Sequence, residues 1–443
     1  MRLCVNDMKE QKVGVKFLRQ SDADFASAFA AFIAQDRDNG ADVSEVVRGV
    51  IKAVRRDGMA AVEKYTKEFD HFDLKERSVA VTRDEIDRAE AECHADDLAA
   101  LEFAAARIKS YHEKQLPLDE RYTDELGVTL GWRWTCVDAA GLYAPGGRAA
   151  YPSSVLMNAI PAKVAGVKRL AMVTPTPNNE MNPLVLAAAK RAGIDEIYRI
   201  GGAQAIAALA YGAGSIAPVD VIVGPGNAYV AEAKRQVFGV VGIDSVAGPS
   251  EILVVADGKN DPDWIAADLL SQAEHDPSSQ SVLITDDEEF AGRVSDAVNT
   301  QLAASSRQEI AAAAWENNSA IIIVGALDEA PALVDAIAPE HLELAIDDPE
   351  TMLGKIRHAG AIFLGRHTPE AVGDYVAGPD HVLPTARAAR YASGLSVLDF
   401  MKRTSIIGCD QAALAKIGPA AAKLADAEGL PSHAESVRVR LKE

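Results

Sequence analysis

Three short stretches in the middle of the chain decide the fold: LAMVT at 170–174, EIYRI at 196–200 and VDVIV at 219–223. Each is short and mostly apolar, as buried strands are, and helix-like segments at 183–192 and 203–211 separate them. Apolar strands that alternate with helices are typical of a parallel sheet covered on both faces. This part of the chain is therefore predicted to form an α/β domain.

The same alternation returns after the turn at Gly248-Pro249-Ser250. The elements predicted there are a strand at 252–256, a helix at 263–274, and strands at 282–285, 320–324, 342–346 and 361–364. Two such series predict two similar Rossmann-like domains, each an incomplete doubly wound sheet.

The regions outside these series are expected to be mainly helical. In the first third, apolar residues recur at three- and four-residue spacing, which predicts helices at 42–56, 58–69, 83–92 and 95–114. Strand-like segments follow at 127–134 and 137–143. Residues 396–443 look mostly helical and are too few to sustain a core, so they must dock on another part of the protein.

We expect four units along the chain. They are an N-terminal helical segment at 1–34, a first Rossmann-like domain made of 35–142 and 250–395, a second Rossmann-like domain at 143–249, and a C-terminal tail at 396–443.

Charge and the N-terminal residues limit the partners. The 45 Lys+Arg and 65 Asp+Glu give a net charge of −20, which repels phosphate backbones and anionic lipid. Neither nucleic acid nor a membrane is expected as a partner. Residues 1–17 lack the apolar core of a signal peptide, and the longest stretch without strongly polar residues, 205–214, is far below the about 20 residues of a transmembrane helix. We expect a cytoplasmic protein.

The four cysteines, Cys4, Cys93, Cys136 and Cys409, are scattered and form no CxxC pair. In a reducing compartment they are most simply free thiols. The alternative is that Cys136 acts as a nucleophile, although no neighbour in sequence is basic enough to lower its pKa.

Three polar clusters could carry chemistry. Gln272 and His275 are three residues apart at the end of a predicted helix, so they can converge on a metal ion, or they can form an exposed helix end. Glu340 and His341 precede a predicted strand, where they could transfer protons or merely cap the strand. Asp374 lies in a glycine-punctuated loop, as a metal carboxylate or as an ordinary turn residue.

Glycine-rich turns are the sequence feature that points to a dinucleotide. They stand at 143–147, 201–204 and 224–227, and the last two lie between a strand and a helix, where backbone N–H groups can hold an anion. None is a GxGxxG with an acidic residue about 20 positions later. Each taken alone is also explained as a turn.

Together these clusters resemble the histidinol dehydrogenase family. The similar stretches are GLYAPGG (141–147), GGAQAIAALAYG (201–212), GPGNAYVAEAKRQV (224–237), AGPSEILVVAD (247–257), SQAEHD (271–276), PEHLEL (339–344), GDYVAGPDHVLPT (373–385), SGLSVLDFMKR (393–403) and EGLPSHAESV (428–437). They extend from the first third to the C-terminus in the order of the family.

The resemblance implies a role for each cluster. It implies an NAD-dependent, zinc-containing alcohol dehydrogenase that oxidises L-histidinol to L-histidine in a four-electron reaction, the last step of histidine biosynthesis. The implied zinc ligands, one ion per subunit, are Gln272, His275, Asp374 and His433; the acid/base pair is Glu340 and His341; the NAD contacts are Tyr143, Gln204 and Asn227. The implied substrate contacts are Ser250, His381 and Glu428, together with His341 and the zinc ligands.

The resemblance also assigns the domains. The first Rossmann-like domain would carry the metal and catalytic residues, and the second would bind NAD. Members of the family are homodimers, so the C-terminal tail would complete the partner's site.

One position leaves the substrate open. Asp380 precedes His381 where Asn is more usual, which is compatible with a paralogue that oxidises another polar alcohol, such as a sulfonated propanediol. A regulator that kept the fold and lost catalysis is the non-enzymatic alternative, but it would have no need of the Glu340-His341 pair.

Overall fold

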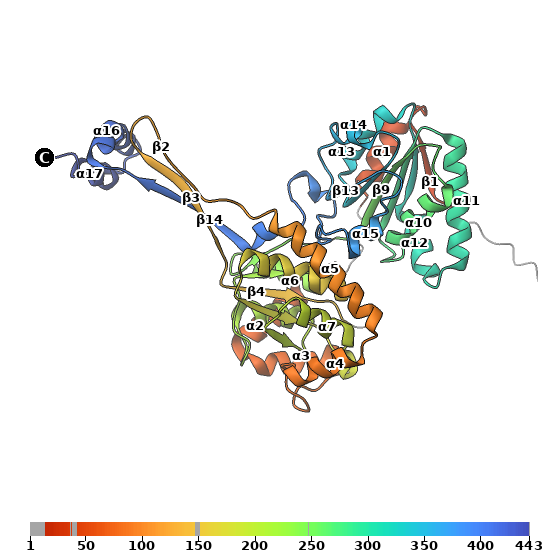
Figure 1. Ribbon diagram of the computed structural model, residues 1–443, viewed down its shortest axis with the longest axis horizontal. Helices are drawn as coiled ribbons and strands as arrows, with labels where there is room; N and C mark the ends of the chain where they lie inside the picture. Colours follow the sequence, from red (N-terminus) through yellow and green to blue (C-terminus); the bar gives the residue numbers. More distant parts are fainter. Residues whose placement is uncertain (1–13, 36, 38–41, 147–150, 247, 443) are drawn as a thin grey trace, which may run out of the picture.

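The computed structural model describes residues 14–35, 37, 42–146, 151–246 and 248–442. It contains two parallel sheets surrounded by helices and a narrow antiparallel sheet that projects from them (Figure 1). The expected α/β fold with two Rossmann-like domains is therefore confirmed. None of the described helices is long and apolar enough to cross a membrane.

The first parallel sheet has five strands in the order β6-β5-β4-β7-β8. They are β4 (Ala139–Tyr143), β5 (Arg169–Val173), β6 (Glu196–Tyr198), β7 (Val221–Val223) and β8 (Gly242–Ile243), connected through α6 (Pro152–Ala165), α7 (Pro183–Arg191), α8 (Gly202–Tyr211) and α9 (Ala228–Val237). Counted along the chain, the order is third, second, first, fourth, fifth, as in a Rossmann half-sheet. The winding reverses between β4 and β7.

The second parallel sheet has six strands in the order β1-β11-β10-β9-β12-β13. They are β1 (Lys16–Arg19), β9 (Glu251–Ala256), β10 (Gln280–Thr285), β11 (Ala320–Ile323), β12 (His341–Ala345) and β13 (Ala361–Leu364). Its helices are α1 (Phe25–Ile33), α10 (Pro262–Ala273), α11 (Glu288–Ala304), α12 (Gln308–Asn318), α13 (Ala330–Ile337), α14 (Pro349–Leu353) and α15 (Glu370–Tyr375). Apart from β1, which is added beside β11, the strand order repeats that of the first sheet.

The domain boundaries differ from those expected. The helices α2 (Ser44–Asp57), α3 (Met59–Phe69), α4 (Arg83–Glu92) and α5 (Ala95–Glu113) pack on the five-stranded sheet, not on the sheet that follows residue 250. For example, Val50 of α2 shares a core with Ile222, and Ile108 of α5 shares one with Leu142. Periodicity shows which face of a helix is apolar, but it does not show which sheet that face covers.

The N-terminal segment also differs from expectation. It contains a strand, β1, as well as the helix α1, and β1 pairs in parallel with β11 about 300 residues further along the chain. A strand this short carries no sequence pattern that could predict its pairing with β11.

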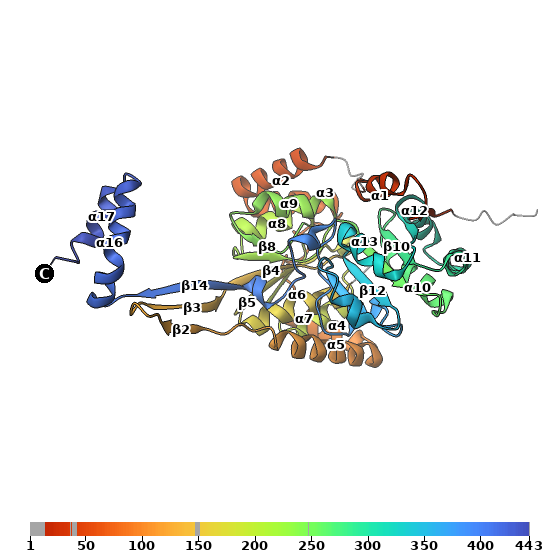
Figure 2. The same cartoon turned by 90° about the horizontal axis from the view of Figure 1, so that it is seen from above.

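The C-terminal tail forms an arm with an earlier hairpin. The strands β2 (Glu120–Thr123), β3 (Thr129–Cys136) and β14 (Met401–Gly408) pair antiparallel in the order β14-β3-β2. At the end of this arm lie α16 (Gln411–Ala427) and α17 (Pro431–Arg438), away from both parallel sheets (Figures 1 and 2). The helices were expected and β14 was not, because β14 is largely exposed and lacks the apolar alternation of a half-buried strand.

Four short 3-10 helices complete the described elements: η1 (Pro177–Asn179), η2 (Leu327–Glu329), η3 (Ala388–Arg390) and η4 (Val397–Phe400). Between η3 and η4 the chain passes from the six-stranded body toward the arm.

Candidate active site

His341 is the first residue of β12 and is almost fully buried. Its Nδ1 lies 2.9 Å from the carbonyl oxygen of Glu251, the first residue of the neighbouring strand β9. A carbonyl accepts only, so Nδ1 carries the proton and Nε2 is left as an acceptor. Burial lowers the pKa of His341, which favours the neutral ring. The histidine is therefore held in the form that can accept a proton.

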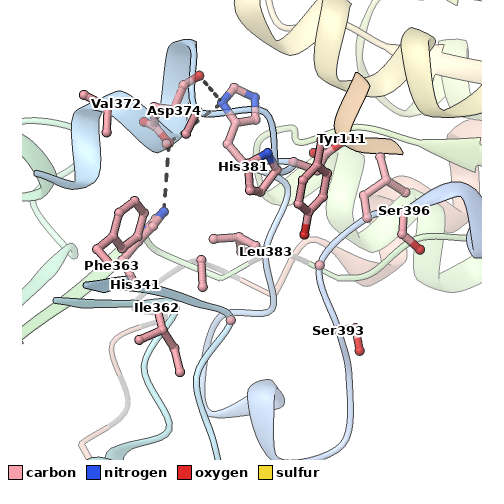
Figure 3. A pocket seen from close by; sticks show the side chains of 18 of the residues that line it. Tyr111, His341, Ile362, Phe363, Val372, Asp374, His381, Leu383, Ser393 and Ser396 are labelled. Atoms are coloured by element: carbon pink, nitrogen blue, oxygen red, sulfur yellow. Dashed lines mark hydrogen bonds and ion pairs between the residues drawn. The ribbon is translucent and has the colours of Figure 1, made fainter. Parts of the chain in front are cut away.

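The Nε2 atom of His341 is buried and makes no hydrogen bond with any described residue. It faces two carboxyl groups on α15: Glu370 Oε1 lies at 3.6 Å. Asp374 Oδ1 lies at 3.9 Å (Figure 3). A buried polar atom without a partner is costly and is typical of a place where a ligand binds. The ligand-capable atoms of His341, Glu370 and Asp374 lie within 4.8 Å of one another, close enough to hold a metal ion.

Glu340 lies on the other side of the histidine ring. Its Oε2 accepts a hydrogen bond of 2.9 Å from the backbone N–H of Glu251 and lies 3.6 Å from His341 Nδ1. Burial raises the pKa of Glu340 well above its usual range. A carboxyl group with a raised pKa is a stronger base once it is ionised.

Gln272 and His275 lie at the end of α10, where the spacing placed them. Gln272 is 1% exposed, and neither its side-chain oxygen nor its nitrogen bonds to a described residue. His275 is exposed, and its Nδ1 lies 3.4 Å from the hydroxyl of Ser250. A buried amide with both ends unsatisfied is typical of a position where a ligand binds.

Glu370 links α10 to α15 and was not singled out from the sequence. Its Oε2 lies 3.1 Å from the hydroxyl of Ser271, next to Gln272, and its side chain contacts that of Asp374. Burial and the neighbouring Glu370 raise the pKa of Asp374 to about 8. The sequence spacing could have indicated Glu370, because Glu370 and Asp374 are four residues apart and share one face of a helix.

His381 joins the two domains. Its Nδ1 lies 3.0 Å from the carbonyl oxygen of Asp374, and its Nε2 lies 3.1 Å from the hydroxyl of Ser154 on α6 of the five-stranded body. Burial lowers the pKa of His381 to about 4, so the ring is neutral.

A cavity of about 590 Å³ opens beside these side chains. Residues of both bodies line it, including Tyr111 of α5, Phe363 of β13, His341, Asp374, His381 and Ser396 (Figure 3). This volume is within the range of small-molecule sites, which favours a compact polar ligand between the two domains.

The residues implied for NAD lie together at the carboxyl ends of the five-stranded sheet. Tyr143 ends β4, and its hydroxyl accepts a hydrogen bond of 3.2 Å from the N–H of Gly202. Gln204, in the first turn of α8, is 1% exposed, and its buried side-chain oxygen has no described partner. Asn227 caps the start of α9, where its side-chain oxygen accepts from the N–H groups of Tyr229 and Val230.

The turns at this edge require glycine. A Cβ on Gly146 would lie 2.3 Å from the carbonyl oxygen of Pro175, and one on Gly224 would lie 2.2 Å from that of Tyr143. A cavity of about 260 Å³ lies here, lined by Gly146, Pro175 and Asn182 among others. Because the backbone turns pack closely at these glycines, the cavity lies directly beyond the ends of β4 and β5.

His433 and Glu428 lie elsewhere. His433 is an exposed residue of α17, and Glu428 caps the end of α16. Both helices are at the far end of the arm, so one chain does not bring these residues to Gln272, His275 and Asp374 (Figure 2).

The cysteine expectations are confirmed for the described residues. Cys93, Cys136 and Cys409 are free thiols, and Cys4 lies outside the described part of the chain. The thiol of Cys136 donates to the carbonyl of Gly166 at 3.3 Å, at the base of the arm.

Comparison with known proteins identifies the family. The model of the family "Histidinol dehydrogenase" matches residues 33–441. Proteins named histidinol dehydrogenase from Caulobacter vibrioides and Rhodospirillum rubrum are each 62% identical to this chain, over 95% and 96% of it and 98% of their own lengths. A crystal structure of histidinol dehydrogenase from Elizabethkingia anophelis superposes with a TM-score of 0.92 at 36% identity, covering 96% of this chain and 98% of that one. The chain therefore belongs to the histidinol dehydrogenase family.

Proposed function

We propose that this protein oxidises L-histidinol to L-histidine through the aldehyde, with two NAD reduced for each substrate, as the last step of histidine biosynthesis. The observation that carries the proposal is the Nε2 atom of His341, which is buried, unpartnered and held as a proton acceptor at the wall of a cavity. We further propose that the reaction takes place in the cytoplasm, where free thiols are ordinary.

Gln272, whose buried side-chain amide has no described partner, fits a metal ion together with His275 and Asp374. Gln272, His275 and Asp374 offer an amide oxygen, an imidazole nitrogen and a carboxylate, all donors that zinc accepts. We propose that they hold one zinc ion per subunit together with His433 of a second copy. The chemistry that zinc supplies when bound is an electrostatic anchor and template for the substrate.

The carboxyl edge of the five-stranded sheet fits a dinucleotide. The unsatisfied oxygen of Gln204, the hydroxyl of Tyr143 and the α9 N-terminus at Asn227 surround the point where the winding reverses. Dinucleotides bind at such points. We propose that these three residues contact NAD, whose chemistry when bound is the acceptance of hydride.

The chain's own groups then divide the proton transfers. Nε2 of His341 accepts the proton of the substrate hydroxyl, and Glu340 removes a proton from the water that attacks the aldehyde carbon. Nε2 of His341 and the carboxyl group of Glu340 lie on opposite sides of the imidazole ring, and we assign them to successive steps. Ser250, His381 and the partner copy's tail with Glu428 hold the rest of the substrate.

We propose that the active form is a homodimer in which each arm completes the other copy's site. The arm carries exposed apolar side chains along its length, among them Ile407 of β14 at 73% and Leu424 of α16 at 64% exposure. An apolar surface on a projecting element is typical of a subunit interface. The same exchange would place His433 beside Gln272, which one chain alone does not do.

Asp380 does not argue for a different substrate. It is 6% exposed, one side-chain oxygen accepts from the N–H of Val382 at 2.9 Å, and burial raises its pKa well above the usual range. The protonated acid has the shape of an asparagine and can serve in its place. The second candidate, oxidation of a sulfonated propanediol, has no cationic group among the described cavity-lining residues to hold the sulfonate.

The test is the formation of NADH, followed by absorbance. We expect two NADH per L-histidinol consumed, and negligible turnover with 2,3-dihydroxypropane-1-sulfonate. Efficient oxidation of the sulfonate with no oxidation of histidinol would establish the second candidate. No oxidation of any alcohol by a zinc-loaded preparation would favour a binding protein.

A further inference from the structure

Glu251 forms hydrogen bonds with both proposed bases, Glu340 and His341. It begins β9, beside the start of β12, and is 3% exposed. Its carbonyl oxygen holds Nδ1 of His341 at 2.9 Å, and its N–H donates to the carboxyl group of Glu340 at 2.9 Å. Its own carboxyl group accepts from the backbone N–H of Glu340 at 3.3 Å. One residue thus bonds to both members of the pair.

The carboxyl group of Glu251 is oriented by two further contacts. Its Oε1 accepts from the N–H of Ala386 at 3.1 Å and forms an ion pair with Arg37. The ion pair is buried, with side-chain exposures of 10% for Arg37 and 3% for Glu251. Burial raises the pKa of Glu251, while Arg37 opposes the shift.

Arg37 lies between α1, which packs on the six-stranded sheet, and α2, which packs on the five-stranded sheet. It adds a positive charge to a region that already buries Glu251, Glu340 and Glu370. Without that charge, Glu251 would be a buried carboxylate without a counter-ion, which is strongly unfavourable. The carboxyl group would then protonate or turn away from Glu340.

We propose that Arg37 and Glu251 are positioning residues that set the geometry of Glu340 and His341. The inference rests on the acid/base roles proposed above. It predicts that Arg37 acts on turnover through Glu251, without contact with substrate, zinc or NAD. A displacement of about 1 Å at a reacting group costs about 10²-fold in rate, so loss of the ion pair is expected to lower kcat by about that factor.

The experiment compares Arg37→Met with a matched control at the other end of the same strand. Arg366 forms an ion pair with Asp257, which directly follows β9, and its side chain is 21% exposed. Arg366→Met removes the same group far from the two bases. Zinc-loaded enzyme is assayed with histidinol, and kcat, the KM values, zinc content and the melting temperature are measured for each variant.

For Arg37→Met we expect kcat to fall by about 10²-fold, with KM for NAD and zinc content unchanged, and for Arg366→Met a kcat close to wild type. Arg37→Lys should recover part of the loss, because it restores the charge. The double variant Arg37→Met/Glu251→Gln should lose no more than the worse single variant, because the two residues act as one unit.

A loss of kcat in Arg37→Met no larger than in Arg366→Met would overturn the proposal, as would losses that multiply in the double variant. A fall in zinc content together with kcat would show a general loss of structure instead, and would also overturn it. If wild-type enzyme itself fails to oxidise histidinol, the proposed function fails first, independently of Arg37.

Discussion

The two parallel sheets have the same strand order but carry their candidate site residues at opposite edges. The five-stranded sheet offers its carboxyl edge, at Tyr143 and the turns after β4 and β7. The six-stranded sheet offers its amino edge, where Glu251 begins β9 and His341 begins β12. The hydrogen bond between His381 and Ser154 joins the two domains. The same strand order therefore does not determine at which edge of a sheet the candidate site residues lie.

Side chains at the two edges explain the difference. At the carboxyl edge of the five-stranded sheet, Gly146 and Gly224 let backbone turns pack where a Cβ would collide with a carbonyl oxygen. The amino edge of the six-stranded sheet instead buries carboxyl and imidazole groups, which would be costly without a ligand. We interpret the first edge as a cofactor cradle and the second as the proton-transferring and metal-binding edge.

Removing the metal should have the largest effect, and only at the amino edge. The proposed ligands include no thiolate, so a strong chelator should abolish histidinol oxidation and added zinc should restore it. NAD binding, measured by calorimetry, should persist. Full activity in a preparation shown by metal analysis to be zinc-free would contradict the metal assignment.

Zinc affinity should also depend on pH. Burial and Glu370 raise the pKa of Asp374 to about 8, and a metal binds the ionised carboxylate. Below that pKa, zinc must displace the proton of Asp374. For one displaced proton, the affinity for zinc should fall by about tenfold for each unit that the pH decreases. Competition with a chromogenic chelator between pH 8 and about 6 measures the affinity for zinc. A zinc affinity that does not change with pH would exclude Asp374 as a ligand.

Single substitutions at the two edges should affect different kinetic constants. His341→Asn should lower kcat by about 10²–10⁴-fold, the usual contribution of a general base, with zinc content unchanged. Gln204→Ala should instead raise KM for NAD by about tenfold, equivalent to one hydrogen bond, with kcat nearly unchanged. Near-normal turnover in the first variant would mean that another group is the base.

Glu340→Gln should impair the second oxidation more than the first. The amide cannot accept a proton from water, so a single turnover with excess NAD should stop near one NADH per site, where wild type gives two. Rapid-mixing absorbance measures both phases. Equal slowing of the two phases would assign Glu340 to a different step.

The smallest effect should come from Asp380. Because burial favours its neutral acid, Asp380→Asn should keep kcat within about threefold of wild type. Asp380→Ala is the matched control, since it removes the acceptor of the Val382 N–H and should cost about 1 kcal/mol of stability. A change of substrate preference in the Asn variant would give Asp380 a role in specificity.

Local patterns predicted most elements of the fold because their signals are local. The apolar stretches at β5, β9 and β12 and the periodic helices α2 and α5 lie where expected. Pairings between distant segments were not predicted: β1 with β11, β14 with β3, and α2 with the five-stranded sheet. Such pairings depend on tertiary packing, which no window of sequence contains.

The candidate site was predicted through motif resemblance, and its supporting residues were not. Gln272 and His275 lie at one helix end, and Nε2 of His341 lies 3.9 Å from Asp374, while the roles proposed for these residues stay predictions. Glu251 and Glu370 were not predicted as site residues, because an acidic residue at the start of a strand or helix is usually a solvated or capping residue. Only burial and hydrogen-bond geometry distinguish them from solvated acids.

The arm tests the account most directly, because His433 is placed beyond the reach of its own chain's Gln272 and His275. The measurement is complementation between two inactive variants, His275→Ala and His433→Ala, co-expressed so that mixed dimers form. If the tails are exchanged, each mixed dimer contains one site with both histidines, and activity should recover to about a quarter of wild type for random pairing of independent sites. No recovery, with mixed dimers confirmed by mass spectrometry, would contradict the exchange of tails.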